Sequence, residues 1–175
     1  MGTVQKKSAA HAIALSAMLA ALALIFSYIE AILPLSSGIP GVKLGIANLV
    51  VIIALYTLGF RYAMAINLIR ILVAGLLFNG AFGALYSLSG GILSLAVMYL
   101  LKKTGLFSTI GVSMAGGVAH NFGQLLVAAL IVSTMKLFYY FPVLLFSGMI
   151  SGILLGFVAS ITLKKLPEDH FFKPS

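Results

Sequence analysis

Three polar side chains stand close together in an otherwise apolar stretch of the chain: His120, Asn121 and Gln124. His120 and Gln124 are four residues apart, so a helix would place both on one face. Imidazole and amide groups donate and accept hydrogen bonds, and their clustering favours a role in holding a ligand. Internal packing of a hydrogen-bonded histidine is the alternative. Metal binding is not expected, because Glu30 is the one carboxylate in an apolar stretch.

Arg70 is a basic residue in the middle of another apolar stretch, three residues after Asn67. An ionisable side chain inside a membrane protein marks a functional site by default, because its charge is costly to bury. Glu30 is the acid available to pair with Arg70. A structural ion pair is one interpretation. A guanidinium can serve two acceptors, so Arg70 is also expected to bind an anionic group.

The scarcity of acidic residues and cysteine excludes several kinds of catalytic and metal site. The chain has three acidic residues, two of them Glu168 and Asp169 near its end, and no cysteine. Paired carboxylates for glycoside hydrolysis, two-metal phosphate chemistry, calcium loops and thiolate sites are therefore excluded. The Gly-x-x-x-x-Gly-Lys-Ser/Thr phosphate loop is absent as well. We expect no catalytic residue, no metal, no cofactor of the chain's own and no enzymatic activity.

The composition indicates which elements position these residues. Hydrophobic residues make up 62% of the 175, charged residues 8%, and the mean hydropathy is +1.17. About a quarter of the residues of a soluble domain are charged, so we expect an integral membrane protein surrounded by lipid. The net charge of +8 comes from basic residues that flank apolar stretches. They indicate membrane topology rather than nucleic-acid binding.

Six apolar stretches approach the roughly 20 residues that cross a hydrocarbon core of about 30 Å. They predict an all-α bundle of six transmembrane helices in one membrane domain, residues 1–175, with a polar tail at 164–175. A cleavable signal peptide is the weaker interpretation of the first stretch, which exceeds the usual 7–15-residue apolar core. The second stretch is short for a crossing. The predicted helices cover residues 9–33, 44–58, 62–78, 84–101, 109–133 and 142–163.

Lysine and arginine predict the orientation, because they concentrate on the cytoplasmic side of a membrane protein. With six crossings, both termini share a side. Lys43 and Lys136 fall on the other side and Arg70 lies within a crossing, which leaves eight of the 11 basic residues on the side of the termini. Both termini are therefore predicted to be cytoplasmic, in a multi-pass protein of a bacterial cytoplasmic membrane.

With this orientation, most polar residues of the predicted helices lie in the middle or the outer half of the membrane. A channel would carry polar groups along its whole length, so the pattern predicts a pocket open to the outside and closed within. The aromatic residues 138–141 are most simply an interfacial belt, and a cover over the pocket is the alternative. The predicted ligand-binding residues are Lys43, Asn48, Arg70, Asn79, Tyr86, His120, Asn121 and Gln124.

Small residues spaced by four let membrane helices approach closely. Internal packing is the simpler interpretation of each such stripe, and for the first helix docking on another membrane subunit is the alternative. The stripes are Ala12-Ser16-Ala20 and Ala17-Ala21 in the first predicted helix, Ala115-Ala119-Gly123 in the fifth and Gly148-Gly152-Gly156 in the sixth.

Several segments resemble those of known transport proteins. Residues 14–24, Ala-Leu-Ser-Ala-Met-Leu-Ala-Ala-Leu-Ala-Leu, look like the first helix of substrate-binding (S) subunits of energy-coupling factor (ECF) vitamin transporters. Residues 39–48 resemble the segment that opens their second helix. More closely, the chain resembles the Gx transporter family, also labelled heptaprenyl diphosphate synthase component I. The segments that carry this resemblance are residues 43–48, 70–75, 86–91 and 119–124.

The resemblance implies an ECF S-component-like bundle with a pocket on the outer side. It also implies that the Ala17/Ala21 face docks on a transmembrane coupling subunit driven by two ATPase subunits, and that toppling of the small subunit moves the ligand. The family's association with flavin-handling genes favours a bound flavin as ligand, and Lys43 and Arg70 would suit the phosphate of a flavin nucleotide. Gly45 stands where some relatives have an acid, which argues against a riboflavin-type site. Import and export both stay open.

The synthase label gives a second hypothesis from a different class. Such synthases resemble one another in aspartate-rich motifs that hold magnesium and diphosphate, and this chain has one aspartate, Asp169. It would therefore be a non-catalytic membrane partner of a polyprenyl (heptaprenyl) diphosphate synthase. A third hypothesis is an ion-coupled carrier with Glu30 as its proton site.

Overall fold

The computed structural model describes residues 2–33 and 45–166, with side chains described from Ala9 onward except that of Asn79. Regular structure in these residues is entirely helical, which confirms the all-α prediction for the described part of the chain. A π-helical segment, Gly75–Asn79, extends α3, and a 3-10 segment, Met135–Tyr140, precedes α6. The α-helices are α1 (Gly2–Ile32), α2 (Ile46–Thr57), α3 (Phe60–Ala74), α4 (Gly80–Thr104), α5 (Thr109–Ile131) and α6 (Phe141–Lys165).

Five of the described helical segments are long and apolar enough to cross a membrane, which supports a multi-pass membrane protein. The helix predicted at residues 44–58 is the exception. In the structure it is α2, whose 12 residues rise about 18 Å, against about 30 Å of hydrocarbon core. The helix by itself is too short for a full crossing, so the sixth crossing is not confirmed and stays a prediction.

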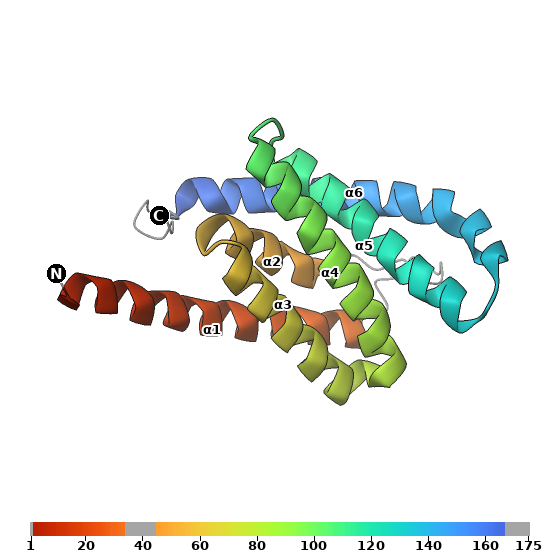
Figure 1. Ribbon diagram of the computed structural model, residues 1–175, viewed down its shortest axis with the longest axis horizontal. Helices are drawn as coiled ribbons and strands as arrows, with labels where there is room; N and C mark the ends of the chain where they lie inside the picture. The colour runs from red at the N-terminus through yellow and green to blue at the C-terminus, as the bar shows by residue number, and fades with distance from the viewer. Residues whose placement is uncertain (1, 34–44, 167–175) are drawn as a thin grey trace.

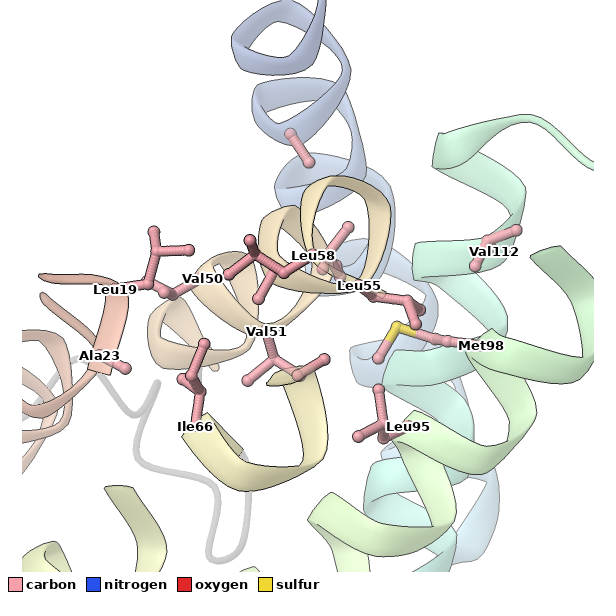
Figure 2. Close-up of a cluster of buried hydrophobic side chains, with 14 of the residues drawn as sticks. Leu19, Ala23, Val50, Val51, Leu55, Leu58, Ile66, Leu95, Met98 and Val112 are labelled. Carbon is pink, nitrogen blue, oxygen red and sulfur yellow. The ribbon is translucent and has the colours of Figure 1, made fainter. Parts of the chain in front are cut away.

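The hydrophobic core is built around α2. This helix is apolar on all sides, and such a helix is buried; α1, α3, α4 and α6 contact it (Figure 1). Its buried side chains lie in one cluster with side chains from the neighbouring helices (Figure 2). The cluster includes Val50, Val51 and Leu55 of α2 and Leu58 just after it, and their neighbours include Leu19 and Ala23 of α1, Ile66 of α3, Leu95 and Met98 of α4 and Val112 of α5.

Charged side chains from two other helices cap the ends of α2. At its start, the Glu30 carboxylate accepts a hydrogen bond from the Ile46 backbone N–H at 3.0 Å. At its end, Lys102 Nζ donates to the Leu55 carbonyl at 2.6 Å and lies 4.7 Å from the ring centroid of Tyr56. Terminal backbone groups lack partners within their own helix, and the helix dipole favours an anion at the start and a cation at the end. One terminal backbone group at each end of this buried helix thus gains a charged side-chain partner.

Helices α5 and α6 pack through the glycine stripe of α6. A Cβ atom on Gly152 would lie 2.6 Å from the Cα of Met114, and one on Gly148 would lie 2.8 Å from the carbonyl oxygen of Gly117. Gly156 approaches the Ile110 Cα in the same way. Close approach of this kind is what small residues allow in membrane helices. The internal-packing interpretation of this stripe is confirmed.

The two small-residue stripes of α1 have different surroundings. Ala12 is buried and Ala20 packs against the core, whereas Ala17 and Ala21 are exposed. The first part of α1 extends past the neighbouring helices (Figure 1). The Ala17/Ala21 face is therefore exposed in the described part of the chain.

Candidate functional site

A polar cavity of about 70 Å³ lies between the six α-helices that the structure describes. A water molecule needs roughly 10–15 Å³ by this kind of measure, so the cavity has room for about six waters or for one compact ligand group. Every α-helix contributes to its lining. Among the residues that the sequence singled out, those in the lining are Glu30, Asn48, Arg70, His120, Asn121 and Gln124.

Arg70 is held in this cavity by two amide side chains. Its Nη2 donates to Oδ1 of Asn67 at 2.7 Å and to Oδ1 of Asn48 at 3.1 Å. The residue is only 7% exposed, and its Nε has no hydrogen-bond partner among the described residues. Both acceptors are neutral, so they orient the guanidinium without cancelling its charge. An arginine held in this way can offer its remaining donors to an anion.

Glu30 is directed at α2 rather than at Arg70. Its carboxylate caps the Ile46 N–H, and it acts on the charge of Arg70 only through space. The direct ion pair that the sequence suggested does not occur among the contacts of the described residues. The physical reason is competition, because an uncapped helix start carries unpaired N–H groups and a positive partial charge that attract the carboxylate.

The three polar residues of α5, His120, Asn121 and Gln124, make different contacts. The buried Asn121 lines the cavity and also donates from Nδ2 to the Leu144 carbonyl of α6 at 2.7 Å. His120 and Gln124 line the cavity beside Gly90 of α4, where a Cβ atom would lie 2.9 Å from Gln124 Cγ and 3.1 Å from His120 Cε1. Gly90 therefore provides the space that these two side chains fill. Asn121 joins α5 to α6, and all three side chains line the cavity.

Three predicted ligand-binding residues are not found in the described lining. Tyr86 is half-buried on α4 but does not line the cavity. Asn79 ends the π-helical segment, and its side chain is not described. Lys43, with the predicted loop around it, lies outside the described residues. The ligand roles of these three residues stay predictions.

The aromatic residues 138–141 pack on α5. The rings of Phe138 and Phe141 have centroids 6.3 and 5.5 Å from that of Phe122, and Tyr139 is exposed. None of these side chains belongs to the lining that the described residues form. This arrangement favours an interfacial belt over a cover for the cavity.

Serine hydroxyls line the cavity at positions that sequence reasoning missed, namely Ser27, Ser113 and Ser151. Serines in apolar helices commonly bond their own backbone, as Ser27 does to the Ala23 carbonyl at 2.9 Å. Residue type alone therefore gives no signal for a lining serine. Ser113 differs from Ser27, because its buried hydroxyl has no partner among the described residues.

A family model described as heptaprenyl diphosphate synthase component I matches residues 19–162. The matched region contains every residue that lines the cavity and most of the six α-helices. Neither a curated protein nor a solved structure matches the chain.

Proposed function

Because the chain belongs to the heptaprenyl diphosphate synthase component I family, we propose that it is a non-catalytic, membrane-embedded subunit, and that its task is to bind a small anionic ligand in the cavity. The observation that carries this proposal is the arrangement of Arg70 between Asn48 and Asn67. A buried cation requires compensation for its lost hydration, and two neutral acceptors supply only part of it. An anionic ligand group is the natural partner for the remaining charge.

Within this class we favour a substrate-binding S component of an ECF-type transporter. In this assignment the short α2 counts as the sixth crossing, which puts both termini on the cytoplasmic side and the Glu30 end of the bundle outward. The resemblance of residues 14–24 and 39–48 supports this assignment. A separate transmembrane coupling subunit and two ATPase subunits would drive transport, since the chain has no phosphate-binding loop of its own.

The ligand that we favour is a flavin or flavin nucleotide. A phosphate suits Arg70, while His120 and Gln124 offer hydrogen bonds to carbonyl and N–H groups of a flavin ring. The cavity of about 70 Å³ holds a compact group such as phosphate. Binding of the whole flavin would therefore require the lining helices to move apart.

Purification in mild detergent, followed by mass spectrometry and absorbance of the extracted small molecules, tests the proposal directly. We expect a flavin spectrum and saturable binding of flavin mononucleotide. Arg70→Ala should weaken that binding about tenfold or more, as expected for a lost charged hydrogen bond. The exposed Arg61 provides the control, and Arg61→Ala should leave binding unchanged. Failure to bind any vitamin or nucleotide cofactor would contradict the proposal.

The family description itself supports a second candidate, a membrane partner of a heptaprenyl diphosphate synthase. Diphosphate is an anion that Arg70 also suits. The single aspartate of the chain means that the catalytic magnesium site would belong to the partner. Co-purification with a soluble, aspartate-rich prenyltransferase, together with stimulation of its activity, would favour this function over transport.

A further inference from the structure

The cavity continues from Arg70 toward the opposite end of the bundle. Glu30 and Gln124 line it near the ends of α1 and α5, whereas Ser113 lines it one turn after the start of α5. From Ser113 to Gln124 a helix rises about 16 Å. This distance is about half of a hydrocarbon core of roughly 30 Å. The lining therefore reaches into the half of the bundle that the sequence predicted to be closed.

The far end of the cavity is lined by α4 and α5, close to the Lys102 end of the bundle, and Ser113 of α5 lies there against Gly156 of α6. Ser113 is only 2% exposed, and its hydroxyl has no hydrogen-bond partner among the described residues. Ser94 of α4 is 3% exposed and lines the same end. A Cβ atom on Gly116 would lie 2.7 Å from Met98 Sδ and 3.2 Å from Ser94 Oγ, so the glycine keeps this space open for both side chains.

We propose that Ser94 and Ser113 form an uncharged subsite at this end, which takes a carbonyl, amide or hydroxyl group of the ligand. A buried hydroxyl without a partner costs free energy, and a polar group in the cavity would supply the partner that Ser113 lacks. The described residues place no charged side chain at this end of the lining. A charged ligand group would find no counter-ion there, whereas an uncharged polar group is satisfied by hydroxyls.

This subsite rests on the proposed function, because the other end of the same ligand is the anionic group at Arg70. The cavity would therefore bind an elongated ligand with one anionic end and one uncharged, hydrogen-bonding end. Gly116 and Met98 set the width of the far end, which favours a narrow group rather than a bulky one.

The absence of cysteine from the chain permits a test that needs no known ligand. Ser113→Cys in the full-length protein should react with a small hydrophilic methanethiosulfonate, because the proposed subsite is a hydrated part of the cavity. Ala159→Cys is the matched control, since Ala159 on α6 is 0% exposed and does not line the cavity. We expect Ser113→Cys to react at least about tenfold faster than Ala159→Cys. The reagent can reach a thiol in a hydrated cavity, whereas a thiol in a dry, packed core is shielded from it. Equal, slow reaction of both variants would overturn the subsite.

Binding measurements separate the subsite from the function on which it rests. Inorganic phosphate should contact only the Arg70 end, while flavin mononucleotide should reach both ends. Ser113→Ala should weaken the binding of flavin mononucleotide about two- to tenfold, as for an uncharged hydrogen bond, and leave phosphate binding unchanged, whereas Arg70→Ala should weaken both. Unchanged flavin mononucleotide affinity in folded Ser113→Ala, with loss in Arg70→Ala, would overturn the subsite alone. If neither compound binds the wild-type protein, the proposed function is wrong. The methanethiosulfonate reaction rates of the two cysteine variants then test the subsite by themselves.

Discussion

The carboxylate of Glu30 accepts a hydrogen bond from the backbone N–H of Ile46 at 3.0 Å, and this contact fastens the end of α1 to the start of α2. Two residues further along α2, Asn48 accepts a hydrogen bond from Arg70. The cap therefore fixes the start of the buried helix together with one of the two groups that orient the arginine. One short helix thus links the stability of the bundle to the geometry of the cavity.

Removal of this cap should destabilise the protein. Glu30→Ala leaves the Ile46 N–H without its carboxylate, and we expect a loss of about 1–2 kcal/mol, as for other helix caps. Glu30→Gln keeps an oxygen acceptor and loses only the charge, so its loss should be smaller. Thermal unfolding of both variants in one detergent measures the difference. Wild-type stability of Glu30→Ala would show that the cap contributes nothing.

The shape of the Arg70 side chain should matter as well as its charge. Lysine keeps the positive charge but is a point charge without the planar fork of donors. We therefore expect Arg70→Lys to bind flavin mononucleotide with an affinity between those of the wild type and Arg70→Ala. Arg61→Lys, on the exposed start of α3, is the matched control. Full wild-type affinity in Arg70→Lys would mean that only the charge is used.

Lys102 should contribute to stability but not to binding. Lys102→Met removes the hydrogen bond to the Leu55 carbonyl and the contact with the Tyr56 ring, at an expected loss of about 1–2 kcal/mol. Ligand affinity should persist, because Lys102 does not line the cavity. Lys103→Met, at the exposed neighbouring position, should leave thermal unfolding unchanged. Similar effects of the two substitutions would refute a specific cap at Lys102.

A methyl group on Gly152 should separate α5 from α6. Its Cβ would lie 2.6 Å from the Met114 Cα and 2.7 Å from the Ser113 carbonyl oxygen, and forcing extra atoms into a packed interface costs about 1–3 kcal/mol. Gly111→Ala is the control, because the nearest atom to its Cβ would be at 3.7 Å, an ordinary contact. The two variants are compared by thermal unfolding. Equal stability would mean that the helices can relax apart freely.

The exposed alanine pair on α1 should be dispensable for folding. Ala17→Leu combined with Ala21→Leu adds bulk to a surface that is exposed in the described part of the chain, so unfolding and ligand binding should stay as in the wild type. Co-purification with an ECF coupling subunit should be lost, because the larger side chains prevent close helix approach. Ala12→Leu, at a buried position, should instead destabilise the protein. If the double variant loses stability as well, the face packs internally.

Local sequence signals were sufficient for the helices and for several of the turns between them. Apolar stretches longer than about 18 residues predict crossing helices, because the backbone N–H and C=O groups of a segment in lipid must be hydrogen-bonded within the protein, as they are in a helix. Glycine stands at three of the reversals, because Gly59, Gly80 and Gly105 adopt φ of 86°, 68° and 68°, a conformation that other residues rarely enter. The glycine stripe of α6 was equally readable, because spacing by four places small residues on one face.

The tertiary structure decided how these parts combine. The apolar sequence of α2 does not say which helices surround it, and only the folded chain buries it among α1, α3, α4 and α6. Glu30 was predicted beside Arg70, but the start of α2 provides N–H groups that only the packed bundle brings to the carboxylate. Ser113 could not be distinguished from other serines until the packing of the helices left its hydroxyl in the cavity lining without a partner among the described residues. The sequence by itself determined that the helices lie in a membrane and which polar side chains they carry, because both follow from composition and periodicity. Their partners depend on contacts between distant segments, which only the folded chain creates.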